Sequence, residues 1–378
     1  MLSPPRITVA WEISVPNEVL FEIFNNLSVS NLAPLTCVSN EFKAVAEHIL
    51  YSSITIKDVL STSSPSPWRT KRCCESIIQR AYLGKSIRGF HIRWQFGSHP
   101  SSRPSFDLSS TLEKLEHVLR SGILESLESL ELWLGAANRG VQSSIPHTIE
   151  RLISGSHFPQ LASCSLGTEW AKGLPSYSGV LDNFLGSLQL LRHLKLHDHR
   201  ATLNLPPVAL PILSSFRGSP ATSASLLPGR PISYLSLTGE DCDVNQEILT
   251  RFTKTIVPLR FLDLSGMSVR PILLRNLATY LPAIEVLKIR LALRHTLHYA
   301  LTGIRLLTGL SSVLSKFRHL SYLDLSPTSV AGGDAEQESG LCLEWYRACP
   351  SLKRITFPSH REWFLSSDQL WIPTITKA

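Results

Sequence analysis

The chain has 378 residues, of which 43% are hydrophobic and 18% are charged. This balance excludes a chain dominated by disorder and leaves enough apolar residues for a large core. The net charge of +7 favours acidic partners, but few aromatic residues lie among the basic ones, so we do not expect a nucleic-acid groove.

The cysteines and the hydropathy pattern exclude two further classes. The seven cysteines form no CxxC motif, which argues against a zinc site or a disulfide framework and favours a reducing compartment. No charged stretch followed by an apolar run opens the chain, and no uncharged apolar run approaches the length of a membrane span. We therefore expect no membrane contact and a cytoplasmic or nuclear location.

A short tail, residues 1–12, precedes a segment, residues 13–53, that predicts three short helices. Pro16 suits the first position of a helix, and Glu18 complements its dipole. The apolar stripe of this first helix comprises Val19, Leu20, Ile23, Phe24 and Leu27. The second helix carries Leu32, Leu35 and Val38, and the third, capped by Ser39 or Asn40, carries Phe42, Val45, Ala46, Ile49 and Leu50. So small a unit cannot hide all of these side chains, so the surplus should face the rest of the chain or a partner.

The run VPNEVLFEIFNNLSVSNLAPLTCVSNEFKAVAEHILYSSI resembles an F-box. The matching positions are Pro16, Glu18, Val19, Leu20, Ile23, Phe24, Leu27, Leu32, Leu35, Val38, Ser39 and Phe42. The run departs from the motif at Val15, where Leu is usual, and at Phe42, where Trp is common. The resemblance implies docking onto the Skp-type adaptor of a cullin–RING ubiquitin ligase, with Pro16, Leu20, Ile23, Phe24 and Leu27 as partner contacts as well as core residues. The alternative is a helical subdomain packed only on its own chain.

Residues 54–68 read as a connecting strand and loop, and residues 69–378 carry a recurring pattern of the form apolar-x-x-apolar-x-apolar. Its copies begin at Ile87, Leu127, Leu161, Leu191, Leu213, Ile232, Leu259, Ile284, Leu320 and Leu352. Each resembles the strand of a leucine-rich repeat, although the signature asparagine is missing. Together they predict a right-handed α/β solenoid with irregular repeats. A single globular α/β domain is the alternative.

Amphipathic helices are predicted between the strands, at residues 111–123, 179–191, 245–256 and 303–314. The second half also resembles fungal F-box proteins with degenerate repeats, through LSSFRGSP (213–220) and LLPGRPISYLSL (226–237). The terminal run ITFPSHREWFLSSDQLWIP (355–373) carries paired tryptophans, Trp363 and Trp371, like that group. These tryptophans predict a cap that closes the last repeat.

Residues between and just after the strand leucines should project from the concave face of the sheet. They are His91, Arg93, Glu131, Trp133, Ser165, Lys195, His197, Ser236, Asp263, Lys288, Arg290, Asp324 and Thr356. The candidate substrate face comprises Arg93, Trp133, Lys195, Lys288 and Arg290, whose basic members suit an acidic or phosphorylated segment. An ordinary solvated sheet face is the alternative.

The sequence offers little sign of chemistry. His193, His197, Asp198 and His199 suggest a zinc site by composition, but a polar strand edge running into a turn is the favoured interpretation. No GxSxG, HExxH or GxGxxG motif occurs, and Gly84-Lys85-Ser86 lacks the first glycine of a phosphate loop. We therefore expect no catalytic residues, no metal and no cofactor.

These observations predict an adaptor: the F-box binds a Skp-type protein and through it a cullin, and the repeats bind a protein target for ubiquitin transfer. The alternative is an F-box scaffold acting outside any ligase. A metal-dependent or hydrolytic α/β enzyme is a third possibility, for which the motif search gives no support.

Overall fold

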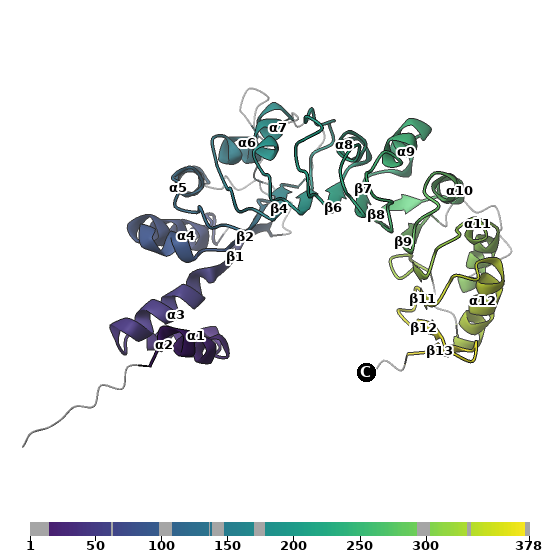
Figure 1. Ribbon diagram of the computed structural model, residues 1–378, viewed down its shortest axis with the longest axis horizontal. Helices are drawn as coiled ribbons and strands as arrows, with labels where there is room; N and C mark the ends of the chain where they lie inside the picture. The colour runs from purple at the N-terminus through teal and green to yellow at the C-terminus, as the bar shows by residue number, and fades with distance from the viewer. Residues whose placement is uncertain are drawn as a thin grey trace, which may run out of the picture.

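The computed structural model of the chain describes residues 15–61, 63–97, 108–135, 137, 147–169, 178–292, 303–330 and 334–374. The expected N-terminal tail, residues 1–12, lies outside the described residues. The chain curves into an arc, with three helices at its N-terminal end and a long sheet that lines the inside of the curve (Figure 1).

The three predicted N-terminal helices are present. They are α1 (Asn17–Asn25), α2 (Val29–Leu35) and α3 (Asn40–Ser52). Their core consists of Leu20, Phe24, Leu32, Val45 and Ala46, and it is separate from the core of the sheet. Ser39 caps α3 by accepting a hydrogen bond from the backbone N–H of Phe42 at 3.1 Å.

The sheet has 13 strands that follow one another in sequence order. They are β1 (Ser53–Leu60), β2 (Gly89–Phe96), β3 (Ser129–Trp133), β4 (Ser163–Gly167), β5 (His193–Leu196), β6 (Ser215–Gly218), β7 (Tyr234–Thr238), β8 (Phe261–Val269), β9 (Val286–Leu291), β10 (Tyr322–Asp324), β11 (Arg354–Thr356), β12 (Glu362–Leu365) and β13 (Trp371–Pro373). Strands β1 to β11 pair in parallel, and β12 and β13 add antiparallel pairs.

Helices cover the convex side of the sheet (Figure 1). They are α4 (Trp68–Gln79), α5 (Ser109–Arg120), α6 (Thr148–Ile153), α7 (Ser178–Gly186), α8 (Pro220–Leu226), α9 (Gln246–Phe252), α10 (Pro271–Tyr280), α11 (Ser311–Leu314) and α12 (Ala335–Ala348). Three 3₁₀ helices are η1 (Ala81–Ser86), η2 (Asp241–Asp243) and η4 (Gly303–Leu310). The helices predicted at 111–123, 179–191 and 245–256 are present but shorter, and the one at 303–314 begins as a 3₁₀ helix.

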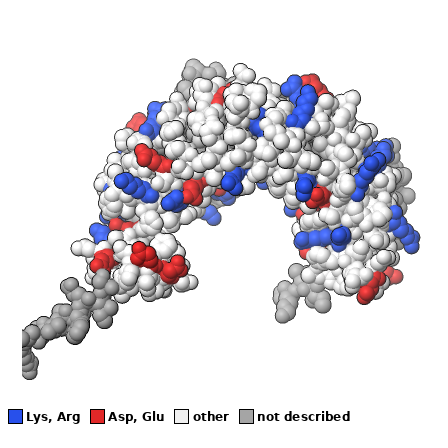
Figure 2. Space-filling view, viewed as in Figure 1, with Lys and Arg blue, Asp and Glu red and all other residues white. Residues whose placement is uncertain are grey.

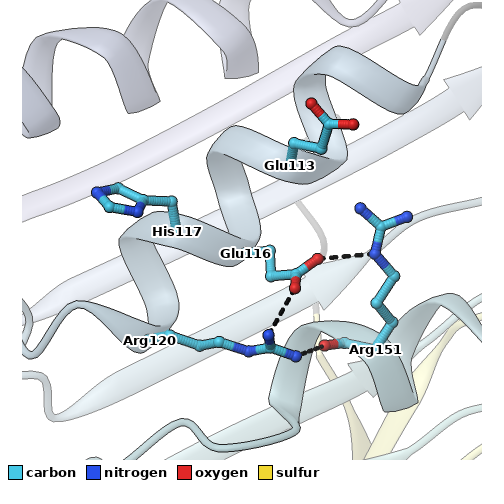
Figure 3. Close-up of a pocket in the computed structure, with 5 residues that line it drawn as sticks. All are labelled: Glu113, Glu116, His117, Arg120 and Arg151. Atoms are coloured by element: carbon cyan, nitrogen blue, oxygen red, sulfur yellow. Dashed lines mark hydrogen bonds and ion pairs between the residues drawn. The ribbon is translucent and has the colours of Figure 1, made fainter.

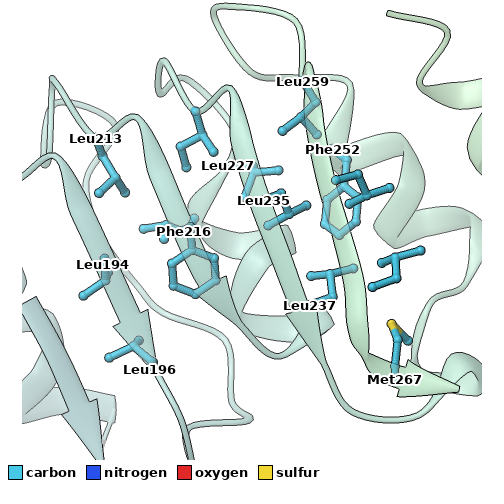
Figure 4. Close-up of a cluster of buried hydrophobic side chains, with 14 of the residues drawn as sticks. Leu194, Leu196, Leu213, Phe216, Leu227, Leu235, Leu237, Phe252, Leu259 and Met267 are labelled. Carbon is cyan, nitrogen blue, oxygen red and sulfur yellow. The ribbon is translucent and has the colours of Figure 1, made fainter. Parts of the chain in front are cut away.

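All ten predicted repeat strands lie in the sheet, as β2 to β11 in that order. Their apolar positions point toward the helices, and Leu194, Phe216 and Leu235 show the stacking from strand to strand (Figure 4). These three are at most 1% exposed. Full burial of such a side chain contributes about 1.5–3 kcal/mol, so the sum over the repeats accounts for the solenoid. The predicted α/β solenoid is confirmed.

The strand expected as a connector is instead the first strand of the sheet. Ile54 and Ile56 of β1 lie in register with Phe90 and Ile92 of β2. Tyr51-x-x-Ile54-x-Ile56 is therefore a further copy of the repeat pattern, and the solenoid begins at Ser53. Helix α3 leads into this strand without a linker, because α3 ends at Ser52.

An irregular connection between β5 and β6 is held by one arginine. Arg230 is only 2% exposed, and its guanidinium donates to the carbonyl oxygens of Pro206, Ala209, Leu226 and Pro228 at 2.6–3.3 Å. These bonds give the buried guanidinium its acceptors. They also supply donors to carbonyl oxygens that a helix would pair with its own backbone N–H groups. The run LLPGRPIS thus has a structural role in this fold.

The C-terminal tryptophans close the solenoid. Trp363 of β12 and Trp371 of β13 are 3% and 8% exposed, and both belong to the main core. Glu338 of α12 is fully buried and accepts hydrogen bonds from Ser359 Oγ at 2.6 Å, Arg361 Nη1 at 2.8 Å and Trp363 Nε1 at 2.8 Å. This carboxylate fastens the terminal strands to the last helix.

Candidate interaction surfaces

The F-box-like helices divide their apolar residues between a core and a free surface. Leu20 and Phe24 are each 3% exposed, and Phe24 meets Phe42 edge to face with ring centroids 5.3 Å apart. Leu27, Leu35 and Phe42 are half-buried against the same core, and Leu32 is buried in it. Two of the expected partner contacts, Leu20 and Phe24, are therefore interior residues that hold the helices together.

The free surface is carried by other positions of the motif. Val19 and Ile23 are 47% and 52% exposed and lie one turn apart on α1. Val38 is also exposed, as are Pro16, Glu18 and Ser39. Val29, the first residue of α2, is 72% exposed and had not been singled out, because it occupies no position of the motif.

Polar contacts join α3 to the start of the solenoid. Glu47 is 7% exposed, accepts a hydrogen bond from Tyr82 Oη at 3.1 Å and lies 3.7 Å from Arg80 Nη1. On the next residue, His48 Nδ1 lies 2.9 Å from Ser86 Oγ. With the direct passage of α3 into β1, these contacts fix the position of the F-box-like helices on the repeats.

A central row of side chains crosses the concave face from strand to strand. It comprises Thr55, His91, Glu131, Ser165, Lys195, Arg217, Ser236, Asp263, Lys288, Asp324 and Thr356. Basic and acidic groups lie beside one another on both limbs of the arc (Figure 2). Arg93 pairs with Glu131 at 2.7 Å and Lys288 pairs with Asp324 at 2.9 Å. The Asp324 hydrogen bond, which outweighs partial burial, raises the pKa of Lys288.

In the middle of the arc, three described basic side chains lack the acidic partners that several basic side chains have on both limbs. Among the described residues, Arg192, Lys195 and Arg217 form no ion pair, although Lys195 and Arg217 lie in register on β5 and β6. Arg217 is half-buried, and its Nε has no hydrogen-bond partner within the described part of the chain. The sequence pattern did not indicate Arg217, because its strand, Leu213-x-x-Phe216-x-Gly218, is a poor copy of the repeat with glycine at the last apolar position. Arg290 is exposed on β9, opposite Ser268.

Trp133 and His197 add a ring pair beside these cations. Their centroids lie 4.8 Å apart at 71°, and His197 Nε2 lies 3.2 Å from Ser165 Oγ. Desolvation by the neighbouring side chains, and then Arg217, lower the pKa of His197 although part of its ring remains exposed, and Asp198 opposes this shift. The imidazole is therefore neutral near pH 7, so the positive charge here belongs to Lys195 and Arg217.

The histidines near the end of β5 do not share one site. His193 and His197 are exposed, whereas His199 is 2% exposed and contacts Thr222 Oγ1 at 3.2 Å. The Asp198 carboxylate lies 3.1 Å from His147 Nε2 and accepts hydrogen bonds from the backbone N–H and the hydroxyl of Thr168. Within the described ranges, no three histidine, cysteine or acidic residues converge in a geometry that could hold a metal ion.

Burial raises the pKa of the Cys73 and Cys74 thiols to about 11 and about 12, so both are protonated.

A pocket of about 410 Å³ on the helical side is lined by α5 and α6 (Figure 3). Glu116 lies at its centre and binds Arg120 at 2.6 Å and Arg151 at 2.7 Å, while Arg120 also donates to the carbonyl oxygen of Arg151. These charged groups satisfy one another. The pocket therefore contains the bonds that join two consecutive repeats.

Comparisons with known proteins match the N-terminal part of this description. Residues 13–57 match the F-box-like family model. The chain resembles the leucine-rich repeat-containing protein LegL7 from Legionella pneumophila, with 14% identity and a TM-score of 0.37 over 72% of this chain and 90% of that one. It also resembles TLR13 in a complex with ssRNA13, with 16% identity and a TM-score of 0.33 over 73% of this chain and 43% of that one. No curated protein matches the sequence significantly.

None of the helices in the described residues is long and apolar enough to cross a bilayer.

Proposed function

We propose that the F-box-like helices bind a Skp-type adaptor and through it a cullin scaffold, and that the solenoid holds a protein target for ubiquitin transfer. The observation that carries this proposal is the exposed apolar pair Val19 and Ile23 on helices whose own core is complete. Exposed apolar side chains on so small a unit, within a segment that matches the F-box-like model, indicate a surface that a partner covers.

In this role the chain performs no bond chemistry. It raises the rate of ubiquitin transfer by holding the target near a charged conjugating enzyme, and that effect depends on a fixed geometry. The contacts of Glu47 with Tyr82 and of His48 with Ser86 support such a geometry, because they hold the adaptor-binding helices on the repeats. The proposal places this activity in the cytoplasm or the nucleus.

The target would bind the concave face. Of the expected residues, Arg93 and Lys288 are neutralised by acidic neighbours, so the charge available to a target is concentrated at Lys195, with Arg217 beside it. Trp133 borders this charge through its contact with His197, and Arg290 is a further exposed cation. An acidic segment of the target fits this surface by charge.

The adaptor contact is tested by binding of the purified full chain to a Skp-type adaptor, measured by calorimetry. The test variant is Val19→Asp/Ile23→Asp, because both side chains are exposed and the fold should tolerate the change. The matched control is Val208→Asp/Ile256→Asp, which alters two apolar residues of the solenoid that are 79% and 67% exposed. We expect at least a tenfold loss of affinity for the test variant alone. Equal binding by wild type and test variant would refute this contact.

Ubiquitin transfer is tested separately, in a reconstituted reaction with the adaptor, a cullin–RING complex and a bound target. Transfer that is lost with Val19→Asp/Ile23→Asp supports the ligase role. Adaptor binding without transfer to any bound protein would instead favour a scaffold that acts outside a ligase.

A further inference from the structure

A second row of concave side chains changes from mostly small polar residues to mostly aromatic and aliphatic residues halfway along the sheet. This row lies two residues before the central row on β1 to β11, and antiparallel pairing continues it onto β12 and β13. On β1 to β6 it consists of Ser53, Gly89, Ser129, Ser163, His193 and Ser215. On β7 to β13 it consists of Tyr234, Phe261, Val286, Tyr322, Arg354, Phe364 and Ile372, which we call the aromatic track. A row that only faced solvent would need no aromatic residue on either half.

Several side chains of the aromatic track contact one another. Tyr234 and Phe261 stack with centroids 4.3 Å apart at 18°. The Arg354 guanidinium lies 4.3 Å from the ring centre of Tyr322 and 5.2 Å from that of Phe364, so its flat face continues the track. Phe364 and Ile372 are 39% and 53% exposed, and the others are half-buried. The track is therefore an ordered apolar surface that is open to a ligand.

Three basic side chains beside the track are paired with acidic residues. Arg260 pairs with Glu285 at 3.6 Å, Lys288 with Asp324 at 2.9 Å and Arg354 with Glu362 at 2.7 Å. By contrast, Lys195 on β5, Arg217 on β6 and Arg192 just before β5 have no acidic partner among the described residues. One concave face thus presents, within the described chain, unpaired cations at its centre, on β6 and at β5, next to the aromatic track on β7 to β13.

We propose that this face binds an extended segment of a protein whose aspartate or glutamate residues lie over Lys195 and Arg217 and whose large apolar residues lie on the aromatic track. The inference rests on the proposed function, because it specifies the target that the solenoid would hold. Lys288 and Arg354 along the track are already paired with Asp324 and Glu362, so the track offers little positive charge to a nucleic-acid backbone and the occupant is a peptide.

The strand spacing sets the length of that segment. Neighbouring strands lie about 4.8 Å apart, so Phe261 on β8 is about 10 Å from Arg217 on β6, and Tyr322 on β10 is about 19 Å away. An extended chain advances about 3.3 Å per residue. The target should therefore carry acidic residues separated by about three to six positions from an aromatic or large aliphatic residue.

The test is selection of peptides from a random display library on the purified full chain, followed by affinity measurements on the selected peptides. We expect enriched peptides to combine an acidic cluster and an apolar residue at that spacing. Phe261→Ser/Tyr322→Ser should weaken binding at least tenfold. Lys195→Glu/Arg217→Glu should weaken it to a similar extent and remove its dependence on salt.

Two further variants make the result specific. Phe364→Ser/Ile372→Ser alters the exposed end of the track, where folding should be unaffected, and it should still weaken peptides that reach β12 and β13. Ser129→Ala/Ser163→Ala alters the polar half of the same row and should leave affinity unchanged.

Three outcomes would overturn the inference: no enriched pattern, affinities that ignore the track variants, or binding of single-stranded RNA that depends on Tyr322. Adaptor binding is measured on the same preparations. If the adaptor binds and no such peptide is enriched, the inference fails and the proposed function stands. If the peptides bind and the adaptor does not, the inferred peptide site stands and the proposed adaptor contact fails.

Discussion

Trp133 and His197 meet edge to face although a whole strand lies between them. Trp133 belongs to β3 and His197 follows β5, and their ring centroids are 4.8 Å apart. The intervening position on β4 is Gly167, which lies in register with Trp133. Because Gly167 has no side chain, the two rings close over it and form one wall of the cationic centre of the concave face.

A side chain at Gly167 should disrupt this arrangement. In Gly167→Ala the added Cβ would lie 2.6 Å from His197 Cβ and 3.2 Å from Asp198 Oδ1, so His197 must move. We expect a loss of about 1–3 kcal/mol in the free energy of unfolding, as for other overpacked sites. Urea denaturation measures it. Gly179→Ala is the matched control, since nothing lies within 4 Å of its added Cβ, and it should not destabilise the protein.

The buried imidazole of His199 should make stability fall in mild acid. Burial lowers its pKa from 6.5 to about 4, with Asp198 opposing this shift and His147 adding to it. The unfolded chain therefore takes up a proton near pH 6.5 that the folded chain refuses until about pH 4. The contribution of His199 is complete above pH 6.5 and should decline by about 3 kcal/mol between these limits.

Urea unfolding at a series of pH values tests this expectation. His199→Asn should flatten the decline between pH 6.5 and 4 relative to wild type. His193→Asn, at an exposed position of β5, should follow the wild-type curve. Identical slopes for all three proteins would show that His199 is not the group responsible.

The parts of this fold that were predictable are those in which local pattern and packing agree. Leu127-x-x-Leu130-x-Leu132 predicted a buried strand because one apolar face is enough to place it in the sheet. The pattern at Tyr51-x-x-Ile54-x-Ile56 was overlooked because it overlaps the end of α3, where helix and strand signals compete.

The surfaces were less predictable, because they depend on pairing between distant strands. Amphipathic periodicity placed Leu20 and Ile23 on one stripe of α1, yet only the packing of α3 decides which of them is covered. Similarly, Lys288 looked like a free cation until β10 placed Asp324 beside it. The aromatic track exists only through register, since its members come from separate strands, β7 to β13.

Arg230 offers a test of the irregular connection between β5 and β6. Its guanidinium donates in several directions at once to Pro206, Ala209 and Leu226, which a lysine ammonium at the same place cannot reproduce. Arg230→Lys should therefore lower the free energy of unfolding by about 2 kcal/mol or more, because buried carbonyls lose their donors. Arg251→Lys, on the exposed i,i+4 pair with Glu247, is the control and should change stability by less than about 0.5 kcal/mol.

Two neighbouring residues of α1 should separate folding from partner binding. Phe24 is 3% exposed and packs on Phe42, so Phe24→Ala should destabilise the three N-terminal helices by about 3 kcal/mol or more. Ile23 is 52% exposed, so Ile23→Ala should leave their stability within about 0.5 kcal/mol of wild type. Hydrogen exchange of α1 to α3, followed by mass spectrometry, measures both effects without depending on the solenoid. Faster exchange in Ile23→Ala than in Phe24→Ala would mean that the division into core and partner surface is reversed.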